Sequence, residues 1–177
     1  MGKETTCSST LDGTRWCDNG DGTVTDLTTD LIWLKKADWG GGYAFWTDDR
    51  EKTTAHDRAS SLRAGASGAE LTDSSVEGDW RLPTLSELAS LISGDEAVST
   101  WEMRAFTGVQ PAPYWSSASY SAYPTRAYFV HLLGGNIGSF NKKTPYFVWP
   151  VRTQAIGNLK LRSFDPEVEE APEYILG

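Results

Sequence analysis

Residues 127–140 read AYFVHLLGGNIGSF, and this stretch decides the architecture of the C-terminal third of the chain. Residues 127–133 and 136–141 resemble strands, and they flank the pair Gly134-Gly135. Two glycines between strand-like runs favour a tight hairpin turn. We therefore predict a β-hairpin here, with residues 146–152 (YFVWPVR) as a third strand, so that the C-terminal third forms a small antiparallel sheet.

The preceding part of the chain predicts a second hairpin and two helices. Residues 23–34 read as two short strands joined by a polar turn. Apolar residues recur at helical spacing over about 53–64, which predicts the first helix. The second helix is expected over 84–93, because Thr84 and Glu87 have the spacing of a capping box. Together with the C-terminal sheet, these elements predict an α+β fold.

Length and composition indicate one domain with a core. The chain has 177 residues, of which 39% are hydrophobic, and eight Trp, seven Tyr and six Phe stand among seventeen Gly. Rigid aromatic side chains joined by Gly-rich turns suit a recognition surface. We expect a leader at 1–17, a ligand-binding domain at 18–152 and an acidic tail at 153–177.

Charge and hydropathy exclude two classes of partner. Sixteen Lys and Arg stand against twenty-four Asp and Glu, so the formal net charge is −8 and the field of the whole molecule repels nucleic acids and anionic membranes. No apolar run approaches the ~20 residues that span a bilayer. We therefore expect neither nucleic-acid binding nor membrane insertion.

The two cysteines, Cys7 and Cys17, lie ten positions apart in a polar segment without nearby histidine. This spacing favours a disulfide over a metal site, although two reduced thiols remain an alternative. A disulfide requires an oxidising compartment, so we expect a secreted protein or one on a cell or virus surface.

The acidic segment at 18–22 (DNGDG) resembles the start of a calcium loop. The register fails, because loop positions 1 and 12 would be Cys17 and Thr28, neither of which carries a carboxylate. A tight turn built on asparagine, aspartate and glycine is the favoured interpretation, and no cofactor is expected. A calcium ion held in another geometry by Asp18, Asp21 and Asp26 stays open as the alternative.

Residues 114–149 concentrate aromatic side chains among Ser and Asn, a mixture that binding surfaces use. His131 alternates with Val130 and Leu132 on the predicted strand, so it is expected to face away from the core; His56, on the first predicted helix, is expected at the surface. The candidate ligand-binding residues are Tyr120, Tyr123, Arg126, Phe129, His131, Asn136, Phe140, Asn141, Tyr146 and Trp149. Trp33, Trp80 and Trp115 are expected to be structural.

Three blocks, at 18–36, 79–92 and 114–152, together resemble the C-terminal domain of the collagen-like bacterial adhesin Lcl and its family. The resemblance implies a C-type-lectin-like fold and a non-enzymatic module that binds a protein or carbohydrate ligand on another surface. Formylglycine-generating enzymes share this fold group, but their chemistry uses a cysteine pair late in the domain, and this chain has no cysteine after Cys17. Trp149 stands where family members commonly carry Arg, which weakens the case for anion binding.

Two other functions remain open at this point. The fold group includes the variable proteins of diversity-generating retroelements, whose C-terminal strands and loops carry the ligand-facing residues. A structural oligomerisation domain is an alternative of another class, because adhesin relatives form homo-oligomers. In that case the aromatic side chains would be buried between subunits.

Overall fold

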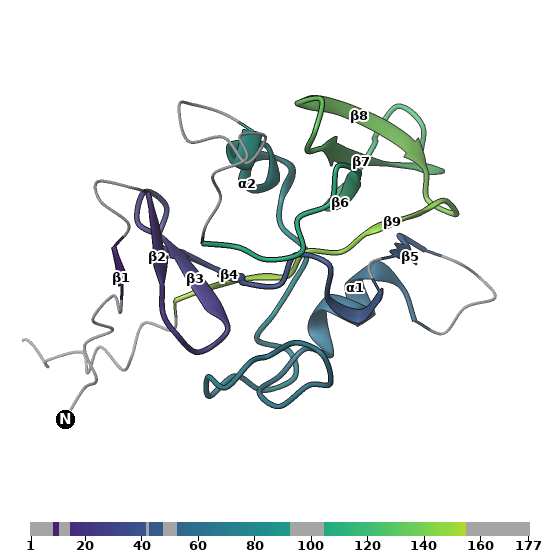
Figure 1. The fold of residues 1–177 in the computed structure, drawn as a ribbon. Helices are drawn as coiled ribbons and strands as arrows, with labels where there is room; N and C mark the ends of the chain where they lie inside the picture. Colours follow the sequence, from purple (N-terminus) through teal and green to yellow (C-terminus); the bar gives the residue numbers. More distant parts are fainter. Residues whose placement is uncertain (1–8, 11–14, 42, 48–52, 93–104, 155–177) are drawn as a thin grey trace, which may run out of the picture.

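The computed structural model describes residues 9–10, 15–41, 43–47, 53–92 and 105–154. These residues form two five-stranded sheets with a few short helices, a sheet-rich arrangement compatible with the predicted α+β class (Figure 1). The N-terminal sheet has the order β1 (Ser9–Thr10), β2 (Trp16–Asp18), β3 (Thr23–Asp26), β4 (Leu31–Leu34), β10 (Val151–Thr153). The C-terminal sheet has the order β5 (Tyr43–Phe45), β9 (Pro145–Phe147), β6 (Pro113–Ser119), β7 (Arg126–His131), β8 (Asn136–Asn141).

The N-terminal sheet contains the hairpin predicted at 23–34. Strands β3 and β4 pair antiparallel from Thr23–Leu34 to Asp26–Leu31, and every residue of both strands is buried. Strand β2 adds to β3 and buries Trp16 and Cys17. Pairing therefore draws Trp16 and Cys17, at the end of the predicted leader, into the sheet, and the predicted domain boundaries stay a prediction. Residues 155–177 of the predicted tail lie outside the described ranges.

The hairpin predicted from 127–140 is confirmed as β7 and β8. Their register runs from Arg126–Asn141 to His131–Asn136 without interruption. The connection has four residues, 132–135, rather than two, with Gly135 at a φ of 62°. Strand β7 ends at His131, before the predicted end at residue 133, because Leu132 is buried and its N–H donates to the carbonyl of Ala112.

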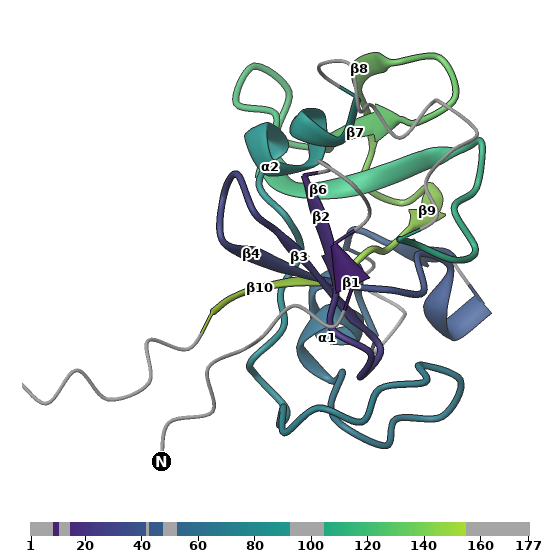
Figure 2. The same ribbon diagram turned by 60° about the vertical axis from the view of Figure 1, so that its left-hand side comes forward.

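The predicted third strand at 146–152 is broken into two strands in different sheets. Strand β9 pairs antiparallel with β5 and parallel with β6, so the C-terminal sheet is mixed rather than antiparallel. Strand β10 pairs with β4. Pro150 lies between them, and a residue without an N–H cannot continue a strand ladder. The segment 148–150 therefore crosses from one sheet to the other through the core (Figures 1 and 2).

The described residues contain the α-helices α1 (Ala55–Ser60) and α2 (Leu85–Ala89) and the 3-10 helices η1 (Trp39–Gly41) and η2 (Ser90–Ile92). The capping box predicted at Thr84 and Glu87 is present at the start of α2, which packs against β6 and β7. Helix α1 is shorter than predicted, and its own capping box begins at Thr54. None of the helices in the described ranges is long and apolar enough to cross a lipid bilayer.

The aromatic core joins the two sheets. Trp33, Trp80 and Trp115 are fully buried, as predicted for structural residues. Trp149, which the sequence placed among the ligand-binding candidates, is also fully buried, so this prediction is wrong. Its ring lies 5.5 Å from Trp33 of the N-terminal sheet and 5.6 Å from Tyr114 of the C-terminal sheet, and its indole N–H donates to the carbonyl of Leu34 at 2.8 Å.

Candidate ligand-binding face

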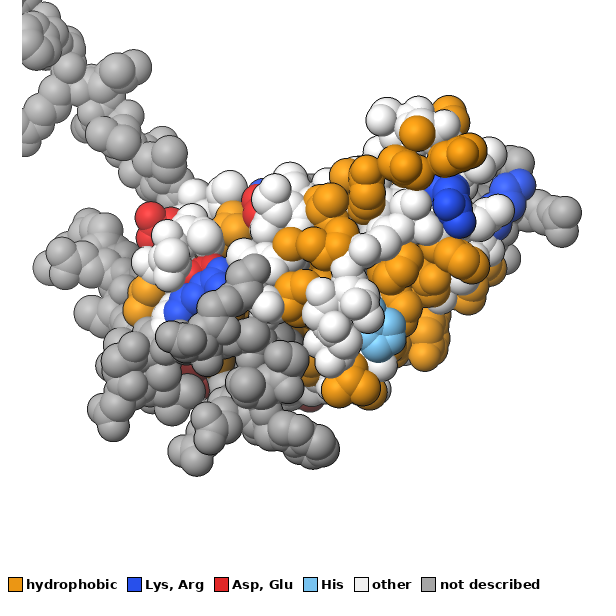
Figure 3. All heavy atoms as spheres, turned by 90° about the horizontal axis from the view of Figure 1, so that it is seen from above, with side chains coloured by type: hydrophobic (Ala, Val, Ile, Leu, Met, Phe, Trp, Pro, Cys, Tyr) orange, Lys and Arg blue, Asp and Glu red, His pale blue; other side chains and the backbone are white. Residues whose placement is uncertain are grey.

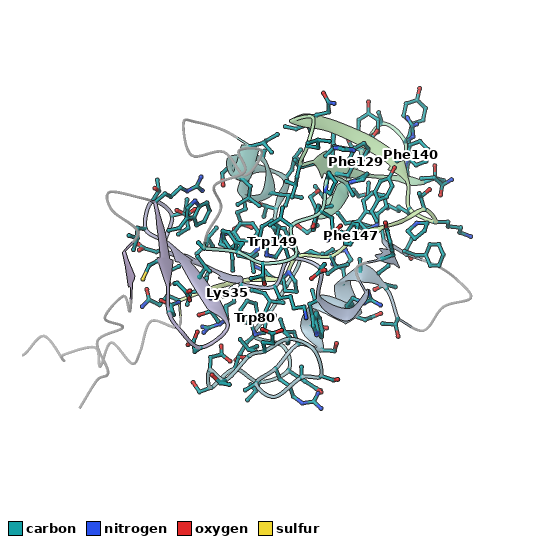
Figure 4. The ribbon with its side chains drawn as sticks, in the orientation of Figure 1. Lys35, Trp80, Phe129, Phe140, Phe147 and Trp149 are labelled. Atoms are coloured by element: carbon teal, nitrogen blue, oxygen red, sulfur yellow. The ribbon has the colours of Figure 1, made fainter. Side chains whose placement is uncertain are left out.

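One face of the C-terminal sheet carries a row of rings, which we call the aromatic face: Phe129, Phe140 and Tyr146. Residues paired across an antiparallel ladder share a face, so the pairs Phe129–Gly138 and Ala127–Phe140 place both phenylalanines on the same side. Both lie over β7 and β8, away from the interior that contains Phe147 and Trp149 (Figure 4). The strand alternation predicted for β7 is also confirmed, because Val130 and Leu132 are buried while Phe129 and His131 are half-buried.

Gly138 makes room for the ring of Phe129. A Cβ atom at Gly138 would lie 2.8 Å from Cζ of Phe129, closer than side chains tolerate. The ring therefore lies across β8 at the one position of that strand that has no side chain. Covering a strand glycine with a cross-strand aromatic ring is a known way to stabilise a sheet. Because Gly138 has no side chain, the Phe129 ring can lie close to the backbone of β8.

Tyr146 connects the core to this surface. Its ring lies 4.5 Å from the buried Trp115, 5.2 Å from Phe129 and 6.1 Å from Phe140. Trp115 is held in turn by its indole N–H, which donates to the carbonyl of Ala44 at 3.0 Å. Burial raises the pKa of Tyr146, so its phenol stays protonated at neutral pH. The aromatic face is therefore a supported row of rings that begins at the core and ends at the exposed Phe140.

A tyrosine-rich turn borders the aromatic face between β6 and β7. The N–H of Tyr120 donates to the carbonyl of Arg126 at 2.9 Å, and the N–H of Arg126 donates to the carbonyl of Tyr123 at 2.8 Å. Tyr120 packs edge-on against Tyr128 at 5.2 Å. Tyr123 is 58% exposed, and Phe140 is 44% exposed. These two rings are the parts of the candidate site that solvent reaches most easily.

Arg126 joins the turn to the aromatic face. Its guanidinium carbon lies 6.0 Å from the ring centres of both Tyr123 and Phe140. In the part of the chain that the structure describes, this side chain contacts aromatic rings and forms no ion pair with a carboxylate. A guanidinium beside two aromatic rings gains cation–π attraction.

Lys142 and Trp46 extend the candidate site, and sequence reasoning missed both. The ammonium of Lys142 lies 4.2 Å from the ring centre of Trp46 and donates to Oγ of Ser119 at 2.7 Å. The indole N–H of Trp46 donates to the carbonyl of Ser116 at 2.8 Å. Trp46 is about seventy positions from Ser116 in the sequence, and only the pairing of β5 with β9 brings it here. The one signal for Lys142 was its place in a basic pair with Lys143.

The ring of His56 also contacts Trp46, at 4.6 Å between ring centres and nearly perpendicular. His56 was expected at the surface, and it is half-buried, with its Nε2 atom shielded from solvent. Burial lowers the pKa of His56, and nearby Lys142 lowers it further while Asp57 opposes this change. At neutral pH the ring is therefore uncharged.

The remaining polar candidates lie around the hairpin. His131 is half-buried beside its strand partner Asn136, which is exposed. Asn141 is exposed too, but its side chain has a structural role, since its Oδ1 accepts from the N–H of Lys143 at 2.9 Å. The structure thus brings together Tyr123, Arg126, Phe129, Phe140 and Tyr146. Tyr120 packs against Tyr123 and Tyr128.

Charge is distributed unevenly between this site and the rest of the molecule. Residues 105–154 contain no Asp or Glu, whereas they contain Arg126, Lys142, Lys143 and Arg152. Arg152 belongs to β10 of the N-terminal sheet and pairs with Asp73 at 3.0 Å. In Figure 3, basic groups lie among hydrophobic side chains in the right-hand part, which carries the C-terminal sheet, while acidic groups appear on the left beside further basic groups. The negative net charge therefore does not describe the field at the candidate site.

The acidic turn at 18–26 forms hydrogen bonds within the protein. Gly20 and Gly22 adopt φ values of 75° and 89°, and Asp18 accepts the N–H of Gly20, as the turn interpretation predicts. Asp18 also pairs with Lys35 at 2.6 Å. Asp21 accepts from the hydroxyl and the N–H of Thr23.

Asp26 was the third calcium candidate, and its place in the structure contradicts that assignment. It is fully buried and pairs with Arg15 through both carboxylate oxygens. Within the described ranges, no three acidic, histidine or cysteine side chains are grouped so that they could hold a metal ion.

Of the two cysteines in the predicted disulfide, only Cys17 lies among the described residues. Cys17 is buried in β2 and is not a free thiol. Cys7 lies outside the described residues, so the pairing of Cys7 with Cys17 stays a prediction.

Comparison with known proteins identifies the family. The family model described as the Lcl C-terminal domain matches residues 22–152, which is most of the chain and includes the whole C-terminal sheet, the aromatic face and the β3–β4 hairpin of the N-terminal sheet. A search among curated proteins found no match. The chain belongs to the Lcl C-terminal domain family, as its three sequence blocks predicted.

Proposed function

We propose that this Lcl C-terminal domain is a non-enzymatic binding or adhesion module that contacts its ligand through the aromatic face and Arg126. The observation that carries the proposal is the gradient of burial along one row of rings, from the buried Trp115 through Tyr146 to the exposed Phe140 and, across Arg126, Tyr123. Exposed rings anchored on buried ones can bury large apolar areas on binding with little loss of side-chain entropy.

The polar groups around these rings suit recognition. They are the amide of Asn136, the tyrosine hydroxyls, the guanidinium of Arg126 and the ammonium of Lys142. Such groups orient a ligand by hydrogen bonding, and a few aromatic and Arg anchors usually carry most of the energy of an interface. The ligand is a protein or a carbohydrate on another surface.

Family membership also supports two further parts of the proposal. The fold is C-type-lectin-like, in keeping with the sheet-rich α+β architecture and the match over 22–152. The protein acts outside the cell or on a cell or virus surface, where the predicted disulfide at Cys7 and Cys17 would be stable. A retroelement-diversified receptor would use the same face, and this alternative stays a prediction.

A structural oligomerisation domain is the second candidate, because of one observation. Leu133 and Ile137, at the tip of the β7–β8 hairpin, are 61% and 52% exposed. Apolar side chains at a protruding tip suit a contact between subunits. Light scattering distinguishes the candidates: a concentration-independent oligomer that loses assembly when Leu133 and Ile137 are replaced by Ser supports the structural role.

The binding proposal is tested with a glycan and protein-partner array. The full chain is compared with the variants Tyr123→Ala and Phe140→Ala, and with Leu27→Ala as the matched control, since Leu27 is similarly exposed in the turn between β3 and β4. We expect the two aromatic variants to lose at least about tenfold in affinity for any partner found, with an unchanged melting temperature. Equal binding by all three variants would show that the ligand uses another surface.

A further inference from the structure

Strand β8 forms one edge of the C-terminal sheet and pairs only with β7. In an antiparallel ladder, residues that exchange hydrogen bonds with the partner strand alternate with residues whose N–H and C=O point outward. The N–H of Lys142 donates to the carbonyl of Thr125, and the same register continues along the hairpin. Counting back from this bond, the backbone groups of Ile137 and Ser139 point away from β7, and they bond to no other segment that the structure describes.

This edge lacks the features that usually protect an exposed strand. Proteins block edges with charged side chains, proline, bulges or very short strands. Strand β8 reads NIGSFN over its six residues, with neither a charge nor a proline, and its register with β7 has no bulge. The opposite edge strand, β5, has only three residues. Among the residues that the structure describes, no segment covers this long edge, so it can pair with another strand.

Positive charge is concentrated at one end of this edge. Arg126 pairs with Asn141 at the last position of β8, and Lys142 follows directly. A second copy of the chain added here through the same sheet would supply no acidic side chain to these cations, because residues 105–154 contain neither Asp nor Glu. A polyanionic sugar would satisfy the cations but would leave the outward backbone groups of Ile137 and Ser139 without a partner.

Resting on the binding function proposed above, we propose that the ligand of this face is an extended acidic peptide segment of a partner protein, which adds to β8 as a further strand of the sheet. Its backbone bonds to the outward N–H and C=O groups of Ile137 and Ser139. Its acidic side chains lie beside Arg126 and Lys142, and an apolar side chain packs on Phe140. In this mode of recognition main-chain bonds supply affinity, and alternate side chains supply specificity.

The proposal is tested first with synthetic probes and the unmodified full chain. The probe is a fluorescein-labelled ten-residue peptide of alternating Thr and Val with two Glu residues at one end, made with the Glu pair at either terminus. One matched peptide carries N-methyl groups on consecutive backbone nitrogens, so that both of its edges are blocked, and another carries Lys in place of Glu. By fluorescence anisotropy we expect one acidic orientation to bind and both matched peptides to bind at least about tenfold more weakly.

Two protein variants test the same contacts from the other side. Ser139→Pro removes the outward N–H while leaving the bonds to β7, and proline is tolerated at strand edges in this position. Its matched control is Ser139→Thr, which keeps the N–H. Arg126→Glu should weaken binding of the Glu peptide and strengthen binding of the Lys peptide. Loss of the fold would not produce such an exchange of preference. Thermal melting monitors folding of each variant.

The outcomes separate this inference from the function on which it rests. Equal binding of the N-methylated peptide, or undiminished binding by Ser139→Pro, would overturn strand addition. If dextran sulfate binds in an Arg126-dependent manner while no peptide binds, the ligand is a polyanionic sugar, and only the peptide inference fails. A dimer abolished by Ser139→Pro without peptide binding would assign the edge to a second copy. If no ligand responds to changes at Phe140 or Arg126, both proposals fail.

Discussion

The two sheets of this domain use their residues in opposite ways. In the N-terminal sheet, every residue of β3 and β4 is buried, and Asp26 and Asp18 are paired with Arg15 and Lys35. In the C-terminal sheet, β8 is largely exposed, and the cation beside it contacts rings instead of carboxylates. One sheet is closed by pairing and burial, and the other keeps an edge and a face for contact with another molecule. The difference supports the proposal that the first region provides stability and the second provides recognition.

Trp149 connects the two regions, and its removal should have the largest effect. Trp149→Ala deletes a fully buried ring that contacts Trp33, Phe106 and Tyr114, so we expect a loss of about 3 to 5 kcal/mol in the free energy of unfolding. Urea denaturation measures it, with Phe140→Ala as the exposed aromatic control. A variant that kept its stability but lost its ligand would restore Trp149 to the binding site.

The buried ion pair of the N-terminal sheet should have the next largest effect. Asp26→Asn leaves Arg15 without its carboxylate in a buried site, which typically costs about 3 kcal/mol. Burial acts to raise the pKa of Asp26, but bonds from Arg15 and from the N–H of Thr28 outweigh it, so the pKa lies below its ordinary value.

The pH dependence of Asp26 follows from the direction of this shift. The unfolded state takes up a proton near pH ~3.9, before the folded state does, so the stabilisation is complete above that pH and is lost as the pH falls through the lower folded pKa. Acid denaturation of Asp26→Asn should therefore be shallower than that of the wild type in this range. Identical acid limbs would contradict the assignment.

Gly138 tests the support of the aromatic face, with an expected effect of about 1 kcal/mol. In Gly138→Ala the added methyl group meets the Phe129 ring, which must move, and such overpacking costs about 1 to 3 kcal/mol, at the low end here because the contact is the far end of a ring. The double variant Gly138→Ala with Phe129→Leu should recover most of the loss in a double-mutant cycle. If the stability losses of Gly138→Ala and Phe129→Leu were additive, the position of the Phe129 ring would not depend on Gly138.

His56 should produce the smallest effect, a modest pH dependence of stability. Its pKa is lowered in the folded state by burial, so the unfolded state binds a proton first as the pH falls below ~6.5. Melting temperature should therefore decline between about pH 7 and pH 5 in the wild type and less so in His56→Gln. If both proteins show the same decline, Trp46 and Lys142 do not control the ionisation of this ring.

Local pattern was enough to predict several parts of the fold. The hairpin at 23–34, the capping box of Thr84 and Glu87, and the pairing of β7 with β8 all depend on interactions within about twenty residues. The inward and outward alternation of Val130 and His131 followed from the two-residue period of a strand. Exposure of Tyr123 and Phe140 followed from their positions in or beside turns.

The differences between the predicted and the observed structure come from contacts between residues that are far apart in the sequence. The apolar run at 146–152 looks like one strand, because sequence period does not reveal that Pro150 lies where the chain leaves one sheet for the other. Burial of Trp149 depends on that crossing. Trp46 reaches the candidate site only through β5, and the four-residue turn at 132–135 depends on the place of Leu132 in the core.

By itself the sequence determined the family, the helix starts, the two hairpins and the concentration of aromatic residues in the C-terminal third, because each follows from composition or from contacts between near neighbours. Only the tertiary structure decided which rings are buried and which are exposed, which strand forms the open edge, and which charged side chains form ion pairs. The physical reason is that burial and charge pairing are set by the neighbours that a residue meets after folding. For Trp149, Trp46 and Arg152 those neighbours come from distant parts of the chain.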